Sequence, residues 1–299
     1  MDNILKEAAI QIGSGGTAGF VEVCIMHPLD LVKTRLQLQN KNLMKADPQF
    51  YNGVVDCLLK MYKNEGLGSF WKGIIPPILV ETPKRSVKFF TFEQYKQLFL
   101  FGHSSPTPVT YSLAGLSAGI TESILVTPFE VVKVELQANR QKVKDAPSTF
   151  LVARKIIANG GLGSRGLFKG LSATIHRNGL FNMVYFGFYH SMKEIIPAHE
   201  NEKVEFLKKF GIGFASGTLA SCLNIPFDVA KSRIQGPQPQ HNIIKYKTTY
   251  GALATVYKEE GFRALYKGLL PKILRLGPGG AIMLLVFEYM HAYLKNKFD

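Results

Sequence analysis

Three copies of one short pattern, about 100 residues apart, constrain this chain more than any other feature. The copies read HPLDLVKTRLQ (27–37), TPFEVVKVELQ (127–137) and IPFDVAKSRIQ (225–235). Each has a proline, an acid two residues on, a lysine three further and a glutamine four beyond: Pro28, Asp30, Lys33, Gln37; Pro128, Glu130, Lys133, Gln137; Pro226, Asp228, Lys231, Gln235. Single copies are typical of a solvated helix end, but three copies in register indicate an internal repeat.

Two further motifs keep the same spacing. An aromatic-Lys-Gly ending closes EGLGSFWKG (65–73), GLGSRGLFKG (161–170) and EEGFRALYKG (259–268). A GxxxG pair precedes each proline motif, at Gly15/Gly19, Gly115/Gly119 and Gly213/Gly217. The sequence therefore predicts three tandem repeats, 1–103, 104–202 and 203–299.

Each repeat contains two apolar stretches of roughly 20 residues, which is near the length that crosses a membrane. They cover 8–29, 73–92, 109–129, 171–189, 210–227 and 269–290. The second also holds Glu81, Lys84, Arg85 and Lys88, and charges inside a span are tolerated where they face a bundle interior or a water-filled cavity. Small residues at GxxxG allow close helix packing in lipid. We expect a polar-lined helical bundle in a membrane rather than a soluble helical repeat.

The link between the two stretches of each repeat is polar. In FYNGVVDCLLKMYKNEG (50–66), Val54, Leu58 and Met61 recur at helical spacing. This pattern predicts a short amphipathic helix at the membrane surface, with equivalents near 148–158 and 248–259.

Several other classes of site have no support in the sequence. The three cysteines are scattered and the seven histidines are dispersed, so we expect no disulfide framework, metal site or cofactor. No arrangement of nucleophile and base indicates an enzyme. The net charge of +14 suits the attraction of anions, and since the basic residues lie in or beside apolar stretches, we expect no nucleic-acid partner.

The triple Pro-x-acid-x-x-Lys motif with its aromatic-Lys-Gly endings resembles the mitochondrial carrier family over essentially the whole chain. The resemblance implies an all-α membrane protein, with six transmembrane helices around a pseudo-threefold axis and three short matrix surface helices. It also implies alternating access to one central site in the inner mitochondrial membrane, with both termini toward the intermembrane space. A monomer in contact with inner-membrane lipids, cardiolipin at the matrix surface among them, is expected.

By the same resemblance, the acid of one repeat pairs with the lysine of the next and forms a matrix gate. The implied pairs are Asp30 with Lys133, Glu130 with Lys231, and Asp228 with Lys33, each braced by a glutamine (Gln37, Gln137, Gln235). Repeat 2 departs from the pattern. Glu135 stands where the other repeats have Arg35 and Arg233, and Asn159-Gly160 replaces a Glu-Gly pair.

A second repeated motif ends the even stretches as FEQYK (92–96), YHSMK (189–193) and FEYMH (287–291). The resemblance implies a cytoplasmic gate of acid–base pairs here. Lys193 can pair with Glu288, and His291 can pair with Glu93 only when His291 is protonated, whereas Lys96 opposite His190 makes no ion pair. Ordinary solvation of the two histidines is the alternative.

The repeat alignment also predicts a substrate site. Arg177 and Arg275 fall on the same position of repeats 2 and 3, and Val80 is their counterpart in repeat 1. Lys84 and Lys88 follow one and two helical turns later, roughly 6 and 12 Å along the axis. Positive charge at two heights suits a molecule with two carboxylates, held by an arginine fork and by lysine point charges.

Within the family, Arg177 followed by Asn178 resembles the keto-acid and carboxylate carriers. Four stretches (76–96, 181–189, 225–239 and 265–281) are similar to carriers of 2-oxodicarboxylates. This implies exchange of 2-oxoadipate and related C5–C7 oxodicarboxylates for 2-oxoglutarate. The alternatives are an oxoglutarate/malate- or citrate-type carboxylate carrier and, in a different class, a helical scaffold that transports nothing.

Overall fold

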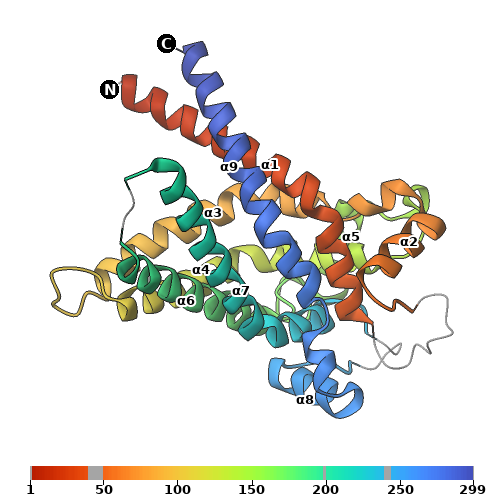
Figure 1. The fold of residues 1–299 in the computed structure, drawn as a ribbon. Coiled ribbons are helices and arrows are strands. Elements are labelled where there is room, and N and C mark those ends of the chain that lie inside the picture. Colours follow the sequence, from red (N-terminus) through yellow and green to blue (C-terminus); the bar gives the residue numbers. More distant parts are fainter. Residues whose placement is uncertain (1, 40–49, 198–199, 239–243, 299) are drawn as a thin grey trace.

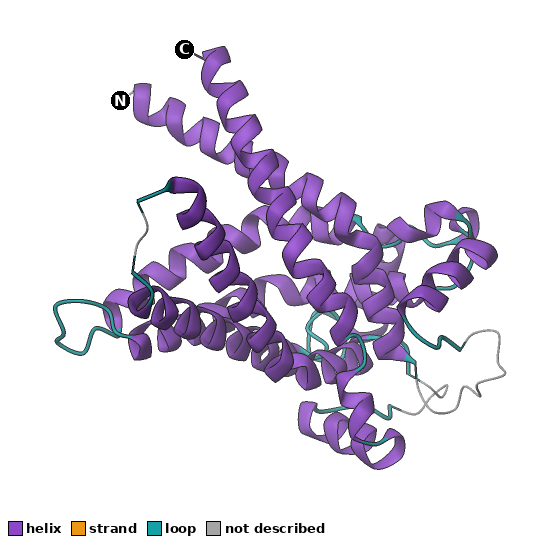
Figure 2. Cartoon of the chain, viewed as in Figure 1, coloured by secondary structure: helices purple, strands orange, loops and turns teal. Residues whose placement is uncertain are grey.

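The computed structural model describes residues 2–39, 50–197, 200–238 and 244–298, and in these the regular structure is helical throughout (Figures 1 and 2). Each repeat contributes two long helices. They are α1 (Asp2–Leu38), α3 (Ile75–Leu98), α4 (Pro108–Ala138), α6 (Leu171–Ile195), α7 (Glu202–Gln235) and α9 (Leu269–Phe298). The all-α prediction is confirmed.

Among the described residues, three helical segments are long and apolar enough to cross a membrane by length and composition alone: Pro108–Ala138, Val204–Gln235 and Phe262–Lys297. The remaining long helices are more polar. In α3 the reason is visible, because Glu81, Lys84 and Lys88 line a central cavity instead of facing outward. A helix with one such charged face has low mean hydropathy even when its other face is apolar.

The first long helix of each repeat is longer than its apolar stretch. The prolines Pro28, Pro128 and Pro226 lie inside α1, α4 and α7, and each helix continues for about another ten residues. The charged signature is therefore part of the helix. Hydropathy ended the expected spans too early because these last turns carry the polar residues of the motif.

Close packing of α4 on α6 depends on the GxxxG pair of repeat 2. A Cβ added at Gly119 would lie 2.6 Å from the backbone oxygen of Asn178, and one at Gly115 would lie 2.6 Å from that of Asn182. Elsewhere α1 packs on α9, α3 on α4, and α6 on α7, so neighbouring repeats are in contact around the bundle. Figure 1 shows α1 and α9 side by side, with both chain ends at the same end of the molecule.

Three short helices lie toward the other end of the long helices (Figure 1): α2 (Val54–Glu65), α5 (Thr149–Gly160) and α8 (Thr249–Glu260). Each stops at a glycine with positive φ, at Gly66, Gly161 and Gly261, a conformation that glycine adopts without steric cost. A 3-10 turn follows in repeats 1 and 3, at η1 (Leu67–Trp71) and η3 (Phe262–Tyr266), and a third, η2 (Val143–Asp145), precedes α5.

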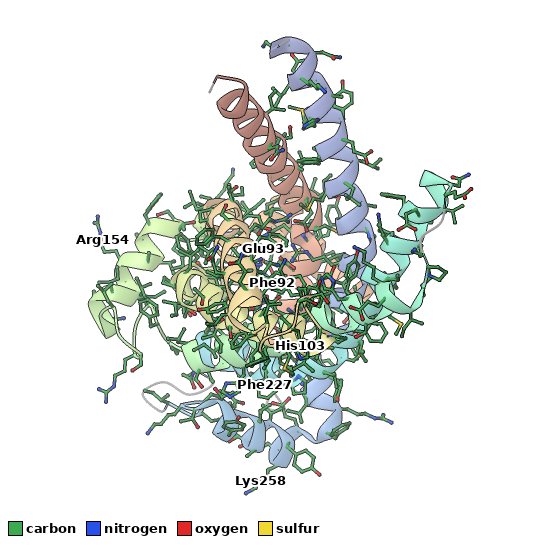
Figure 3. All side chains as sticks on the ribbon, turned by 90° about the vertical axis from the view of Figure 1, so that its left-hand side faces the viewer. Phe92, Glu93, His103, Arg154, Phe227 and Lys258 are labelled. Carbon is green, nitrogen blue, oxygen red and sulfur yellow. The ribbon has the colours of Figure 1, made fainter. Side chains whose placement is uncertain are left out.

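Small apolar cores fasten these short helices to the bundle. In repeat 1, Leu31 and Val32 of α1 are buried against Tyr51, Cys57 and Met61. In repeat 3 the corresponding core includes Val229, Ala230, Tyr246, Ala252 and Val256. Polar side chains on the outer face point away from the molecule, as Figure 3 shows for Arg154 of α5 and Lys258 of α8.

Candidate functional site: a central cavity and its closures

A cavity of about 260 Å³ lies at the centre of the bundle and is lined by side chains from all six long helices. The five residues predicted to bind substrate all line it: Lys84 and Lys88 from α3, Arg177 and Asn178 from α6, and Arg275 from α9. The residues chosen from the repeat alignment therefore line one cavity.

The three cross-repeat ion pairs are present at one end of this cavity. Lys133 Nζ lies 2.8 Å from Asp30 Oδ2, Lys231 Nζ lies 3.0 Å from Glu130 Oε2, and Lys33 Nζ lies 2.6 Å from Asp228 Oδ2. Together they join α1 to α4, α4 to α7 and α7 to α1. The cavity is thus closed at the end of the bundle that carries the short helices.

The signature glutamines bind hydroxyl groups, not the charged pairs. Gln37 Oε1 accepts a hydrogen bond from Ser232 Oγ at 2.7 Å, and Gln137 Oε1 accepts one from Thr34 Oγ1 at 2.7 Å. Gln235 Nε2 donates to Thr174 Oγ1 at 3.3 Å. The glutamines therefore make hydrogen bonds between repeats. These bonds join neighbouring helices beside the ion pairs and, contrary to the expectation, do not bind the ion pairs themselves.

Both cavity arginines are bound to the acids of the gate. Arg275 Nη1 lies 2.7 Å from Asp30 Oδ1, and Arg177 Nη2 lies 2.7 Å from Glu130 Oε1. Arg177 Nη1 is also 3.7 Å from Asp228 Oδ1. The sequence analysis did not anticipate these ion pairs, because it considered lysines alone as partners of the gate acids.

Three more charged residues in or beside the cavity were missed: Lys272 and Glu122 line it, and Glu22 binds the cavity arginine Arg275. Lys272 Nζ lies 3.0 Å from Asp228 Oδ2, Glu22 Oε1 lies 2.9 Å from Arg275 Nη2, and Glu122 accepts a hydrogen bond from Asn182. Glu22 and Glu122 share one repeat position, so the symmetry argument that found the arginines would also have found them. Lys272 had no such signal, since its counterparts are Thr174 and Pro77.

The upper part of the cavity carries the lysines of α3. Lys84 Nζ is 3.6 Å from Glu81 Oε2. Lys88 lines the cavity without an ion pair within 4 Å to any residue that the structure describes, and its Nζ lies 5.2 Å from the ring centroid of Phe89. Asn178 donates to Ser123 Oγ at 3.1 Å. A cation at the height of Lys88 is therefore free to meet an anion.

At the opposite end, the expected cytoplasmic pairs are apart. Lys96 binds Glu93 within α3 at 2.5 Å. The His190 ring stacks on Tyr111 with centroids 3.5 Å apart, and His291 lies beside Phe287. Within the described ranges neither Lys193–Glu288 nor His291–Glu93 forms an ion pair. The chain is thus seen with the gate residues of one end joined and those of the other end separated.

Buried charge clusters, here called latches, join repeats next to the short helices. In the repeat 1 latch, Arg35 and Lys72 bind Glu65 of α2. The two cations also donate to backbone carbonyls beyond the end of α4: Arg35 Nη2 to Asn139 O at 3.0 Å, and Lys72 Nζ to Gln141 O. Burial lowers the pKa of Lys72, and the carboxylate opposes that effect.

The repeat 3 latch has the same chemistry. Arg233 lies 2.9 Å from Glu260 Oε1, and Lys267 Nζ lies 2.7 Å from Glu260 Oε2. Arg233 Nη2 and Lys267 Nζ both donate to Gln39 O, at 2.6 and 2.7 Å. This latch joins repeat 3 to the end of α1.

Repeat 2 has no equivalent latch among its described residues. Glu135 replaces the arginine, and the last residue of α5 is Gly160, where α2 and α8 end in Glu65 and Glu260. The sequence analysis matched Asn159 to these glutamates, whereas the ends of the helices show that Gly160 is the matching residue. Lys169 Nζ donates to Gly236 O of the next repeat, 3.2 Å away, and Gln235 Nε2 donates back to Lys169 O at 3.3 Å.

The family model described as "Mitochondrial carrier protein" matches residues 6–103, 104–200 and 202–298. The chain belongs to the mitochondrial carrier family, so it is a multi-pass transporter of the inner mitochondrial membrane and not an enzyme.

Similar curated proteins include the mitochondrial 2-oxodicarboxylate carriers of Bos taurus, 58% identical over 98% of this chain and 97% of that one, and of Homo sapiens, 57% identical over 99% and 98%. The mitochondrial citrate transporter D of Aspergillus niger is 42% identical over 96% of this chain and 94% of its own.

Proposed function

We propose that this carrier exchanges 2-oxodicarboxylates, meaning 2-oxoadipate and related C5–C7 oxodicarboxylates, for 2-oxoglutarate by alternating access. Support comes from relatives above 55% identity that carry the 2-oxodicarboxylate name. Support also comes from a cavity with positive charge at two heights, from Arg177 and Arg275 to Lys84 and Lys88.

One observation carries the mechanism: the cavity arginines are bound to the gate acids. Arg275 holds Asp30 and Arg177 holds Glu130, and the same acids accept from gate lysines. A substrate carboxylate that binds an arginine competes with these acids for its fork. Because Asp30 and Glu130 each then lose one of their two cations, binding weakens the closure on the matrix side and lets the cavity open there.

The second carboxylate has its own partners. Lys88 has no ion-pair partner in the described residues, and Lys84 has only Glu81 of the same helix, at 3.6 Å. An extended dicarboxylate would span from the arginines to these lysines, and Asn178 lies between them as a neutral donor. Carriage of the charged substrate through the bilayer centre depends on this full set of cations.

A tricarboxylate substrate is the second candidate, since a relative named as a citrate transporter is 42% identical. A third carboxylate would need a third cation in the cavity, and Lys272 is placed to supply it. In liposomes that contain 2-oxoglutarate, uptake of labelled 2-oxoadipate and of labelled citrate separates the two candidates directly.

The remaining roles complete the proposal. Glu93, Lys96, His190, Lys193, Glu288 and His291 form the cytoplasmic gate, which closes when the matrix side opens. The repeats 1–103, 104–202 and 203–299 act as three units around one site. The carrier works as a monomer whose matrix surface contacts inner-membrane lipids, including cardiolipin.

Two variants of reconstituted carrier test the site assignment. Arg275→Leu should abolish exchange, because it removes both a substrate contact and a partner of Asp30. Lys231→Gln should weaken the gate but leave the stabilisation against heat that 2-oxoglutarate gives. Near-normal 2-oxoglutarate exchange in Arg275→Leu would overturn the assignment.

A further inference from the structure

A cavity of about 450 Å³ occupies the place where repeat 2 lacks its latch. It is enclosed by the end of α4, the inner face of α5, the loop before α6 and the end of α7. It is separate from the central cavity, and the two have no lining residue in common. The region that is filled by an ion cluster in repeats 1 and 3 is therefore open here.

The backbone itself keeps this space open. Gly160 has no side chain to reach inward, and a Cβ there would lie 2.4 Å from the backbone oxygen of Arg165. Gly166 is tighter still, since an added Cβ would lie 1.7 Å from Gly161 O. The loop between α5 and α6 thus excludes a glutamate at the position that completes the other two latches.

The polar groups around the cavity are of two kinds. Three cations line it, Lys155, Arg165 and Lys169, and two acceptors lie on the α4 and α7 side, Glu135 and Gln235. Lys155 and Arg165 form no ion pair within 4 Å in the described ranges. Gln235 is 1% exposed, and its Oε1 has no hydrogen-bond partner among the described residues. An unsatisfied buried acceptor is unfavourable, so a ligand that donates to it gains from the contact.

We propose that this cavity binds a small amino dicarboxylate of the glutamate class from the matrix side. Its ammonium group matches the acceptors Glu135 and Gln235 Oε1, and its carboxylates match the cations Arg165, Lys155 and Lys169. A simple dianion would leave the acceptors unpaired, and a simple cation would face three positive side chains. The choice of occupant rests on the proposed function, because amination of a 2-oxodicarboxylate yields an amino dicarboxylate.

Occupancy has a mechanical consequence. The ligand joins α5 and its following loop to the end of α7, and so supplies the link between repeats 2 and 3 that Arg35 and Arg233 supply elsewhere. Because the matrix side must separate these ends to open, the bound carrier stays closed there for longer. The reaction class that feeds this site is the amination of the carrier's own 2-oxo acid, and its product slows further exchange.

The test is equilibrium dialysis of labelled L-glutamate against purified full-length carrier, with and without excess 2-oxoglutarate. We expect one glutamate per chain in both conditions. Arg165→Gln and Lys155→Gln should each weaken binding about tenfold, and Arg154→Gln, on the outward face of the same helix, should leave it unchanged. Glu135→Gln should reduce the preference for glutamate over glutarate, which lacks the ammonium group.

Each contrary result overturns the site. Displacement of glutamate by 2-oxoglutarate would put it in the central cavity, equal competition by inorganic phosphate would indicate a nonspecific anion site, and unchanged binding in both Arg165→Gln and Lys155→Gln would exclude this cavity. Failure of the proposed function would look different: 2-oxoglutarate would not exchange, while glutamate binding and its loss in these variants would persist.

Discussion

The matrix ends of repeats 1 and 3 are closed by buried ion clusters, whereas that of repeat 2 holds a cavity. Arg35 with Glu65, and Arg233 with Glu260, are each almost fully buried and are bound to backbone carbonyls of the next repeat. At the third joint no such ion cluster occurs among the described residues, and the bonds are neutral-acceptor hydrogen bonds: Lys169 Nζ donates to Gly236 O, and Gln235 Nε2 donates to Lys169 O and Thr174 Oγ1. The three repeats thus form a ring with three joints. Within the described residues, the joints between repeats 1 and 2 and between repeats 3 and 1 are tight, and the joint between repeats 2 and 3 is loose.

This difference shows how three similar repeats divide two tasks, which are to fix the geometry of the bundle and to close its matrix side. A buried pair fixes geometry, because removing either partner leaves an uncompensated charge. Two such joints are enough to keep the short helices in register with the bundle. The third joint has a lysine, a glutamine and a cavity in place of an ion cluster, and we expect its closure to depend on what occupies that cavity.

The largest expected effect is loss of an acid from a tight joint. Glu65→Gln should lower the free energy of unfolding by about 3–5 kcal/mol, since it leaves Arg35 and Lys72 buried without their carboxylate. Thermal unfolding of the purified carrier in detergent measures it. Glu135→Gln in repeat 2 is the matched control and should change stability by less than about 1 kcal/mol. Similar losses in the two variants would mean that the joints are equivalent.

An intermediate effect should follow from building a latch into repeat 2. Glu135→Arg alone adds a cation beside Lys155, Arg165 and Lys169, so it should destabilise the carrier. Asn159→Glu supplies an acid at the cavity wall, and together the two changes should be more stable than the sum of the single variants by about 1–2 kcal/mol. Strict additivity in this double-mutant cycle would show that the two positions do not meet.

The smallest effect concerns thiol reactivity at the two kinds of joint. Burial raises the pKa of Cys57 on α2 to about 12, and because the thiolate is the reactive form, labelling at pH 8 requires local opening. In a Val152→Cys variant the new thiol takes the buried position on α5. It should react several-fold faster than Cys57 if the loose joint between repeats 2 and 3 opens more readily than the tight joints. Cys24 and Cys222 are replaced by serine in both proteins. Equal rates would remove the difference in local stability.

Much of the architecture could be read from the sequence, because the repeat carries it. Three motifs in register gave the repeat, the apolar stretches and the periodicity of the links gave the long and the short helices, and the resemblance to the carrier family gave the acid–lysine pairs of the gate. The glycines of GxxxG indicated close helix packing, and in repeat 2 the close partner of α4 is α6, since a side chain at Gly119 would clash with α6. These features follow from local pattern and symmetry, which survive without knowledge of the packing.

The features that could not be predicted are those that break symmetry or cross between repeats. Lys272 has no counterpart in the other repeats, and the bond of Arg275 to Asp30 joins residues at opposite ends of the chain. The repeat 2 cavity depends on the loop between α5 and α6, in which the segment Gly161–Phe168 is two residues longer than the matching segments Gly66–Trp71 and Gly261–Tyr266. A substitution such as Glu135 is visible in the sequence, but the space it leaves is set by how that loop folds.

The central claim, a ring with one loose joint, is tested most directly by distances between the short helices. Spin labels at the exposed positions Lys63 (α2), Arg154 (α5) and Lys258 (α8), on a background without native cysteines, give three pairs, one for each joint. With 2-oxoglutarate present, pulsed electron–electron double resonance should show the largest broadening of the distance distribution for the Arg154–Lys258 pair, because repeats 2 and 3 separate first. Equal broadening of all three pairs, or the largest change across either latched joint, would contradict the account.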